Sequence, residues 1–463
     1  MDPDPQSGTG RALGSANLSA AAENARMLAA LLGVDEEAAA ERLERRVLLT
    51  AAEGPARSWA GEIAELLERT VFVTDDPAAA DLEVVVGSTA PRSQAPRLYA
   101  MIDAASAVVS RAPVASAATM PHPLLAAIYT CAVAGAALRA VIGDPRLPAA
   151  PDPLRIRAVD IGFPDVRSLS PIDLSGAVLV GAGAVAHGFL RALRHLPVRG
   201  RLDVLDPKKV GAGNPNRCLY LTDKDVGALK AEALAERAAG DFLHLRLNAE
   251  VAEFRDYAKT KAKVPLTIVT VDSRRARRQI QKFVPGRVID ASTTDVRGVV
   301  VHSHVQPTDS ACLACIYQHV PDEGARERSI AEGLGVTLAD VKQGFIDEVV
   351  AKSIVAAHPH LNPGQLVGRA FDTLFRELCA AQALRTPEGR QVLTPFAFVS
   401  TLAGALLAVE LVRQVLGQAE TNYWQVDPWR APLGRLRRHR PRVPDCEFCS
   451  RPEAGPVIQE LWG

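Results

Sequence analysis

The pattern of apolar and polar positions predicts two α/β units in succession. In the first, an alanine-rich segment at residues 18–46 is typical of helix. Short β-branched runs, such as that at 82–86, then alternate with polar breaks, and residues 124–142 form a long apolar stretch with the length of a helix. No glycine-rich loop follows any of these strands. We therefore expect residues 18–150 to form a small, degenerate α/β domain without a nucleotide site.

The second unit carries the clearest pattern in the chain. A buried strand at 177–180 runs into a glycine loop, a helix follows, and a second strand at 202–205 ends at Asp206. This order of elements predicts a Rossmann-like, mostly parallel sheet with helices on both faces. We expect the domain to span residues 172–430, interrupted by a polar, mostly helical insertion at 320–392.

Composition limits the classes of function. A chain of 463 residues, 48% of them hydrophobic, is long enough for two or three domains with large cores. The 53 basic and 53 acidic side chains balance, which argues against a nucleic-acid-binding protein. Residues 1–17 are rich in Gly, Ser and Pro and predict a disordered tail. The arginines within the C-terminal tail, 431–463, predict a solvated face or a platform for an acidic partner.

Neither a membrane nor a secretory segment is expected. The N-terminus is polar, without a basic and then apolar pattern. The longest uncharged apolar run, 394–409, ends at Glu410 and is shorter than the roughly 20 residues that span a bilayer. We therefore expect a cytoplasmic protein, in which this run is a buried helix.

The glycine loop is the first candidate site. Gly181 allows a sharp turn after the strand, and Gly183 allows the backbone to approach a phosphate. The helix that begins at Ala184 presents free N–H groups and a partial positive charge to that phosphate. Asp206, at the end of the second strand, is placed to accept hydrogen bonds from a ribose. These residues alone fit NAD as well as ATP.

Polar residues further along the chain favour ATP. Asn214, Arg217 and Lys230 follow the ribose-binding acid closely, and two cations and an amide there suit a triphosphate. Asp272 ends the strand at 266–271, where a carboxylate facing phosphates is a natural ligand for Mg²⁺. We predict that these residues form an ATP and magnesium site, with Arg217 and Lys230 assisting catalysis.

Taken in this order, the motifs resemble the adenylation domain of the ThiF, MoeB and ubiquitin-activating enzyme superfamily. The resemblance covers residues 172–310 and 394–430. It implies that Asp206 holds the ribose, that Asn214, Arg217 and Lys230 hold the phosphates, and that Asp272 holds the magnesium.

The resemblance also implies a function. The first domain would be an inactive adenylation-like half, and the substrate would be a ubiquitin-like protein ending in glycine that is passed on to a conjugating enzyme. Among bacterial relatives the chain is most similar to the BilD type of antiphage operons. A homodimer is expected.

Three features depart from the family pattern. Ser273 follows the magnesium aspartate where the family usually has asparagine, and the glycine loop ends in Ala186. The N-terminal Arg-Tyr-x-Arg segment, which lends an arginine to a partner subunit, has no clear counterpart. The source of any such arginine therefore stays open.

Two Cys-x-x-Cys pairs predict a metal site. Cys312 and Cys315 form one pair, and Cys446 and Cys449 form the other. Four thiolates suit tetrahedral zinc with no open coordination position, which makes the site structural. The alternatives are two unrelated reduced dithiols, or replacement of a thiolate by His304 or His319.

The three other cysteines differ in context. Cys131 lies in an apolar helix and is expected in the core, whereas Cys218 follows Arg217, where packing is favoured over catalysis. Cys379 precedes a polar loop and the helix beginning at Pro395, where activating relatives carry a reactive cysteine. We predict that Cys379 is the catalytic thiol that takes the acyl group as a thioester, against a buried helical cysteine.

Two other functions stay open. One is an adenylating enzyme without a thioester step, as in sulfur-carrier activation or peptide nucleotidylation. The other is a non-catalytic or NAD-linked Rossmann protein that serves as a binding module.

Overall fold

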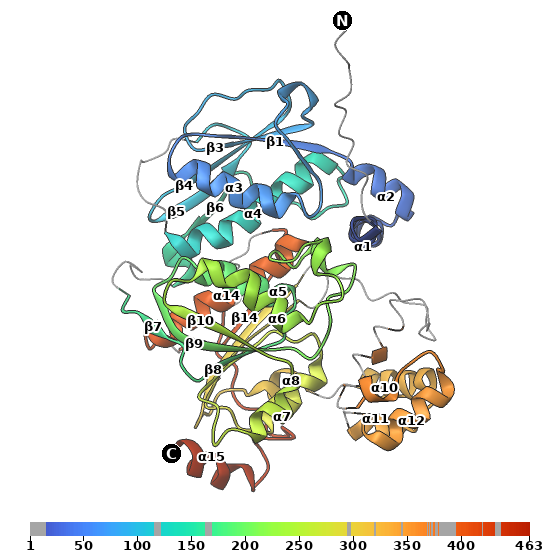
Figure 1. Ribbon diagram of the computed structural model, residues 1–463. Coiled ribbons are helices and arrows are strands. Elements are labelled where there is room, and N and C mark those ends of the chain that lie inside the picture. The colour runs from blue at the N-terminus through green and yellow to red at the C-terminus, as the bar shows by residue number, and fades with distance from the viewer. Residues whose placement is uncertain are drawn as a thin grey trace, which may run out of the picture.

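A computed structural model shows a chain of two stacked α/β units with a helical module at the side (Figure 1). The structure describes residues 15–114, 122–162, 169–293, 298–318, 321–343, 346–367, 395–418, 420–430 and 437–463, together with residues 369, 371, 374, 375 and 378.

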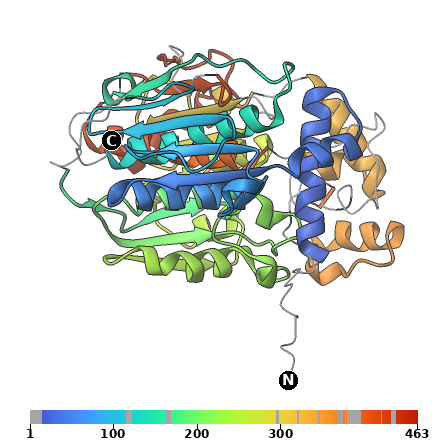
Figure 2. The same cartoon turned by 90° about the horizontal axis from the view of Figure 1, so that it is seen from above.

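The first unit is a six-stranded sheet with helices packed against it. Helices α1 (Ser15–Leu32) and α2 (Glu36–Leu43) precede the sheet and project to one side of it (Figure 2). The sheet order is β2-β1-β3-β4-β5-β6, parallel from β2 to β4 and antiparallel beyond. The strands are β1 (Arg46–Ala51), β2 (Phe72–Thr74), β3 (Leu82–Val86), β4 (Arg97–Ile102), β5 (Ser106–Ser110) and β6 (Leu154–Arg157), with helices α3 (Pro55–Leu67) and α4 (Pro123–Ile142).

The second unit is an eight-stranded sheet in the order β10-β9-β8-β11-β12-β13-β14, with β7 beside β9. Strand β13 pairs antiparallel with both β12 and β14, and all other pairs are parallel. The strands are β7 (Ile172–Asp173), β8 (Ala177–Val180), β9 (Val198–Leu205), β10 (Leu245–Glu250), β11 (Leu266–Val269), β12 (Arg287–Thr293), β13 (Val299–Val305) and β14 (Tyr423–Val426). The helices of this unit are α5 (Ala184–Leu193), α6 (Lys230–Ala238), α7 (Phe254–Lys259), α8 (Arg274–Gln281), α9 (Leu313–Ile316), α14 (Ala397–Val415) and α15 (Ala454–Trp462). The predicted mixed α/β fold with a Rossmann-like, mostly parallel sheet is confirmed.

Alternation along the central strand explains why helices cover both faces of this sheet. Ala177 and Leu179 belong to the core shared with α5 and α14, whereas Val178 and Val180 pack with residues of α7, α8 and α9. A strand buried on both faces reads as a continuous apolar run, as residues 177–180 do.

The two sheets repeat one topology. In the first unit the order β2-β1-β3-β4-β5-β6 matches β9-β8-β11-β12-β13-β14 in the second, with the same parallel and antiparallel pairs, and β10 adds an edge strand to the second sheet. Helix α3 follows the first central strand as α5 follows β8, and α4 precedes the last strand as α14 precedes β14. The chain is therefore a tandem pair of like units.

Helices α3, α4, α5 and α14 form the seam between the units (Figure 1). Glycines allow α5 and α14 to cross closely, because a Cβ on Gly188 would lie 2.7 Å from Cα of Thr401, and one on Gly404 would overlap the α5 backbone. Helices α4 and α14 are long and apolar enough to cross a membrane, but 67% and 94% of their apolar windows are buried inside the protein. They are core helices of the seam.

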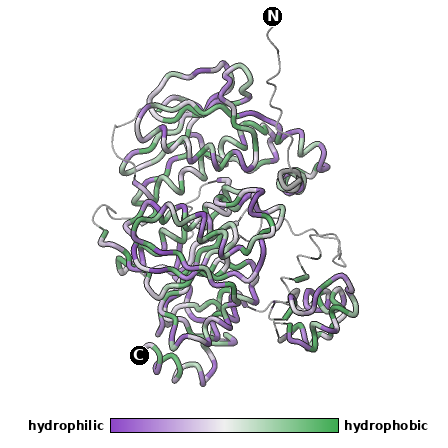
Figure 3. The backbone as a smooth tube through the Cα atoms, in the orientation of Figure 1, coloured by the Kyte–Doolittle hydropathy of each residue, from purple (hydrophilic) through white to green (hydrophobic). Residues whose placement is uncertain are grey.

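The insertion forms a small module with its own core. Helices α10 (Pro321–Leu334), α11 (Leu338–Gln343) and α12 (Glu348–Ala357) pack around a separate apolar cluster. Along them hydrophilic and hydrophobic residues alternate (Figure 3). A buried Arg275 on α8 ties the module to the second unit, since it donates to Glu327 Oε1 at 2.9 Å and to the carbonyl oxygen of Val341 at 2.6 Å.

Some predicted element boundaries were wrong. The single helix expected over 18–46 is two helices, α1 and α2, separated at Gly33, which has φ +64°. Arg46 begins strand β1, which we did not expect, and β6 continues the first sheet to Arg157. The proline-rich stretch at 145–153 therefore lies inside the first unit, between α4 and β6.

The arginine-rich C-terminal tail covers the edge strand β14. Arg438 forms an antiparallel bridge with Tyr423, and the guanidinium of Arg437 lies over the ring of Trp424, 3.3 Å from its centroid. The side chain of Arg440 also lies over Tyr423, at 4.8 Å. Part of the basic run thus stacks on aromatic rings, which shields an otherwise open sheet edge.

Candidate functional site

The glycine loop joins β8 to α5 and leaves the N-terminus of that helix free. Gly181 has φ +97°, and a Cβ there would lie 3.1 Å from N of Val271 and 3.2 Å from C of Thr270. Gly183 occupies the N-cap of α5, without a side-chain cap, and no atom lies within 4 Å of a Cβ built on it. The first N–H groups of α5 are therefore open to an anionic ligand, as expected for a loop that approaches a phosphate.

Asp206 is fixed against this loop. Its Oδ2 accepts from N of Ala182 at 2.9 Å, and its Oδ1 accepts from N of Lys208 at 2.9 Å. The side chain is buried, but each oxygen keeps a second lone pair. The carboxylate thus remains able to accept hydrogen bonds from a ligand in the glycine loop.

The segment after Asp206 carries the amide and the two cations that were predicted to bind phosphates. The side chain of Asn214 closes a turn, because its Oδ1 accepts from N of Gly211 at 2.9 Å. Lys230 is partly exposed and begins helix α6. Nη1 of Arg217 donates to Glu23 of α1 at 2.5 Å and to Asn216 Oδ1 at 2.7 Å. Nη2 and Nε of Arg217 take no part in these bonds.

Glu23 was not found from the sequence. It lies 194 positions before Arg217, within an alanine-rich helix, and no local motif around it indicates a binding role. Its contact brings the first unit to the edge of the candidate site.

Asp272 lies one loop away on the adjacent strand end. Its side chain is 56% exposed, and Nζ of Lys208 lies 3.8 Å from its Oδ1. The next residue, Ser273, caps α8 by accepting from N of Ala276. Lys208 was missed by sequence reasoning, although its position two residues after Asp206 could have indicated it. The carboxylate is open to solvent, as a ligand of a phosphate-bound Mg²⁺ needs to be.

Glu253 is a second acid that the sequence did not indicate. It precedes α7 and interacts electrostatically with Lys208, Asp206 and Arg369 of the insertion. Burial raises the pKa of this carboxyl to about 7, against the opposing effect of Lys208. The insertion therefore contributes a charge to the surroundings of the candidate site.

Arg277 is held in the protein core by several polar partners. It is buried, pairs with Asp290 at 2.9 Å between Nε and Oδ1, and lies over the ring of Tyr317. Its Nη2 also donates to the carbonyl oxygen of Ala291 at 2.8 Å. This arginine, five residues after Asp272, thus joins β12 to α8 inside the core.

The four cysteines of the two Cys-x-x-Cys pairs converge. The Sγ atom of Cys312 lies 3.7 Å from those of Cys315 and Cys446, Sγ of Cys315 lies 3.4 Å from that of Cys449, and all four lie within 4.8 Å of one another. Zn–S bonds of about 2.3 Å at tetrahedral angles place sulfur atoms about 3.8 Å apart. The group fits zinc without a histidine; His304 is buried on β13, and His319 lies outside the described residues.

The structure describes the surroundings of two of the three other cysteines. Cys131 is buried in α4, as expected of a core residue. Cys218 is buried beside Val210 and Leu221, and burial raises the pKa of its thiol, which favours packing over nucleophilic catalysis. Cys379 lies outside the described residues.

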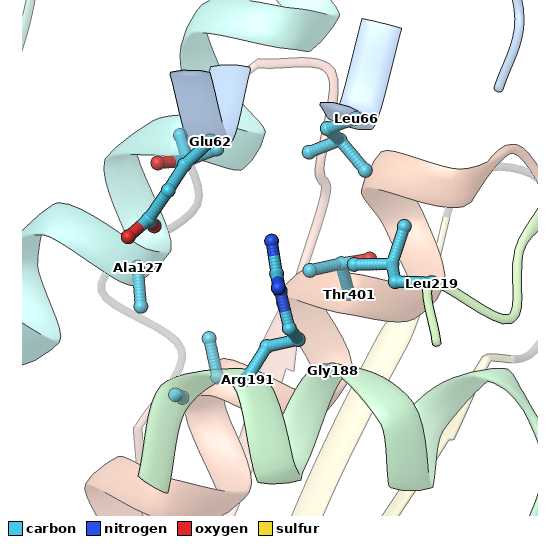
Figure 4. A pocket seen from close by; sticks show the side chains of 10 residues that line it. Glu62, Leu66, Ala127, Gly188, Arg191, Leu219 and Thr401 are labelled. Atoms are coloured by element: carbon cyan, nitrogen blue, oxygen red, sulfur yellow. The ribbon is translucent and has the colours of Figure 1, made fainter. Parts of the chain in front are cut away.

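A small pocket lies at the seam rather than in the glycine loop (Figure 4). Glu62 and Leu66 of α3, Ala127 of α4, Arg191 of α5 and Thr401 of α14 line it, and the Arg191 side chain points into it. Its walls come from packing helices of both units, so we assign it to the seam.

Family comparison covers both units. The model described as "E1 N-terminal domain" matches residues 17–164, and the model of the ThiF family matches residues 154–448, well over half of the chain. The chain belongs to the ThiF family. The ThiF match includes the glycine loop, Asp206, Asp272 and the first three zinc-site cysteines, and it spans the helical insertion.

Individual relatives are distant. The uncharacterized protein y4jF of Sinorhizobium fredii (strain NBRC 101917 / NGR234) is 28% identical over 296 residues, which are 59% of this chain and 56% of that protein. The chain therefore spans little more than half the length of that relative.

Among solved structures, E. coli MccB with ATP is 13% identical, covers 63% of this chain and 68% of its own, and gives a TM-score of 0.37. MccB with MccA-N7isoASN is also 13% identical, covers 59% and 66%, and gives 0.36. Similarity at this level carries no information on substrate.

Proposed function

We propose that this ThiF-family protein uses ATP to adenylate the C-terminal carboxylate of a ubiquitin-like protein that ends in glycine. The observation that carries the proposal is the uncapped N-terminus of α5, bordered by the carboxylate of Asp206, inside the segment that matches the family model. An anion-binding helix end beside a ribose-binding acid is what an ATP site needs.

Each residue of the site has a distinct part in binding. The lone pairs left on Asp206 would accept from the ribose hydroxyls, and the N–H groups of the first turn of α5 would face a phosphate. Asn214, Arg217 and Lys230 would contact the triphosphate, and Asp272 would hold magnesium. Bound magnesium would supply charge neutralisation between the phosphate oxygens.

The adenylation step requires little proton transfer. A carboxylate oxygen of the partner's terminal glycine attacks the α-phosphorus, and the bond from that phosphorus to the pyrophosphate oxygen breaks. Negative charge grows on the α-phosphate and on the leaving pyrophosphate, so the donors left on Arg217 and the ammonium of Lys230 stabilise the transition state more than the ground state.

A second step follows if Cys379 is the catalytic thiol. Its thiolate attacks the carbonyl carbon of the acyl-adenylate, AMP leaves, and the thioester is passed to a conjugating enzyme. The four cysteines would hold a structural zinc. Cytoplasmic location, a homodimer and a BilD-like role in antiphage defence complete the proposal.

Mass spectrometry of the intact protein without reductant tests both steps. Wild type, Cys379→Ala and the core control Cys131→Ala are each mixed with Mg-ATP and a candidate ubiquitin-like protein ending in glycine. We expect an adduct of the partner's mass, removed by dithiothreitol, on wild type and on the control but not on Cys379→Ala.

Other outcomes decide between the alternatives. An adenylated partner with no adduct on any form supports the enzyme without a thioester step. If no product forms, ATP binding is compared between wild type and Asp272→Ala with Mg²⁺ present. Absent binding by both would overturn the ATP site itself, whereas equal binding by both would overturn only the part assigned to Asp272.

A further inference from the structure

One arginine of the first unit holds the loop that carries Asn214 and Arg217. Nη1 of Arg69 donates to the carbonyl oxygens of Pro215 at 2.6 Å and Leu221 at 3.0 Å, and Nη2 donates to that of Leu219 at 2.9 Å. Arg69 follows helix α3, on the other side of the seam. A guanidinium has five donors in a planar fork, so a single side chain can fix three carbonyls in one arrangement.

Helix α1 adds a second line of contacts to the same place. Nδ2 of Asn24 donates to the carbonyl oxygen of Arg69 at 2.7 Å, and Oδ1 of Asn24 accepts from Nδ2 of Asn216 at 3.4 Å. The neighbouring residue, Glu23, accepts a hydrogen bond from Nη1 of Arg217. The backbone of Arg69 and the loop that its side chain grips are therefore tied to the same turn of α1.

The loop is held from the opposite side by α5, the helix of the glycine loop. N of Tyr220 donates to Nδ1 of the buried His187 at 3.1 Å, and the hydroxyl of Tyr220 donates to Asp241 at 2.6 Å. His187 lies one turn after Gly183, whose carbonyl oxygen accepts from its backbone N–H. The loop is thus clamped between the first unit and the helix whose N-terminus we assign to a phosphate.

These contacts fall on the backbone on both sides of Arg217. Fixing a loop before the ligand arrives removes part of the ordering cost of binding, which otherwise reduces affinity. We propose that Arg69 is a positioning residue, through which the inactive first unit holds the 214–221 loop in the geometry that binds the triphosphate. The proposal rests on the ATP site proposed above.

Two measurements on the full-length protein test it: backbone hydrogen–deuterium exchange of the loop and the Kd for Mg-ATP. In Arg69→Gln, amides of residues 214–221 should exchange about tenfold faster, since roughly one charged hydrogen bond corresponds to a factor of ten. Peptides of β1 and β3 should be unchanged. The Kd for Mg-ATP should rise about tenfold, and saturating ATP should restore the slow exchange.

Two further variants separate positioning from simple stability. Arg69→Lys keeps the charge but not the fork, so it should lie between wild type and Arg69→Gln. Arg57→Gln is the matched control, because Arg57 lies on α3 of the same unit and pairs with Glu53 in an exposed contact. It should leave both the exchange rates and the Kd unchanged.

Contrary results are distinct. If the amides of 214–221 exchange at an unchanged rate in Arg69→Gln, Arg69 does not position the loop. If they exchange faster but the Kd for Mg-ATP is unchanged, Arg69 positions the loop without a role in nucleotide binding. Faster exchange throughout the first unit would assign Arg69 to folding alone. If wild type itself does not bind Mg-ATP, the proposed function fails together with the nucleotide part of this inference, while the exchange data still decide whether Arg69 holds the loop.

Discussion

The two units share one strand order but differ at the turn after the first strand. In the second unit the turn is Gly181-Ala182-Gly183, and α5 begins with its N–H groups free. In the first unit Glu53-Gly54 leads into Pro55 at the start of α3. Proline has no N–H to offer, and the exposed carboxylate of Glu53 would repel a phosphate. The two units thus share one topology, and the proposed nucleotide site depends on a few residues of a single turn.

The residues that follow β2 in the first unit and β9 in the second differ in the same way. Both strands run into acids: β2 into Asp75 and Asp76, and β9 into Asp206. Asp76 accepts from N of Ala78 and so caps a short 3-10 turn, whereas Asp206 accepts from N of Ala182 in the glycine loop. An acid at this position is common to both units, and only in the second is it joined to a helix N-terminus.

The largest difference that we expect between the two units is that only the second depends on a bound metal for its stability. The four-cysteine group belongs to the second unit, so Cys446→Ser should lose zinc and destabilise the protein by on the order of 5 kcal/mol, because binding energy at such sites is folding energy. Atomic absorption should give about one zinc per wild-type chain, and urea denaturation gives the stability. Cys131→Ala, in the first unit, should keep the zinc. A metal-free wild type would remove this difference between the units.

Helices α5 and α14 pack closely in the seam between the units, and a substitution of Gly404 on α14 tests how much this packing stabilises the protein. In Gly404→Ala the new Cβ would overlap the α5 backbone around Phe189, so the free energy of unfolding should fall by about 3 kcal/mol. Chemical denaturation measures it. Gly61→Ala on α3 is the control, since no atom lies within 4 Å of a Cβ there, and it should be neutral or slightly stabilising. Equal stabilities of the two variants would mean that the helices can separate freely.

The two turns can be compared directly by one substitution in each. Gly181→Ala forces a Cβ against Val271 at a positive φ, so the Kd for Mg-ATP should rise about 100-fold, or about 2.7 kcal/mol. Gly54→Ala also has a positive φ, +74°, but an open surrounding, so it should cost stability alone. Isothermal titration calorimetry measures the Kd for Mg-ATP of both variants. A similar loss in both variants would contradict the assignment of the site to the second unit.

The smallest expected effect is a dependence on pH. Burial, with the nearby charges of Arg69 and Lys230, lowers the pKa of His187 from 6.5 to about 3, while Asp225 opposes the shift. Below pH 6.5 the unfolded chain therefore binds a proton that the folded chain does not. Between pH 6.5 and pH 5.5 the free energy of unfolding should fall by on the order of 1 kcal/mol.

His187→Asn isolates this dependence, because its Oδ1 can still accept from N of Tyr220. Urea denaturation at pH 7, 6 and 5 should give a shallower loss for the variant than for wild type. Parallel pH profiles would show that His187 carries no part of the acid sensitivity.

The sequence predicted the second unit better than the first, for a physical reason. The strand at 177–180, the glycine loop and Asp206 lie within 30 residues of one another, so a local pattern contains the whole βαβ unit. Strand β1 was missed because Arg46 follows helix-forming residues, and its pairing with β3, some 35 residues away, decides its conformation.

The contacts around the candidate site were harder to predict. Arg69 reaches its three carbonyls across about 150 residues, and Glu23 reaches Arg217 across 194. Nothing near either residue marks it as different from a surface charge. The cysteine pairs, by contrast, lie 134 residues apart and were still matched, because their spacing carries a chemical signature of its own.

The tandem repeat of one topology also determines how the protein responds to dilution. Two separate subunits that braced each other's loops would part at low concentration. Here α4 and α14 belong to one polypeptide, so each unit meets the other at an effective concentration on the order of millimolar, however few molecules are present. The hold of Arg69 on the loop is then an intramolecular property, and it persists at the low copy numbers of a single cell.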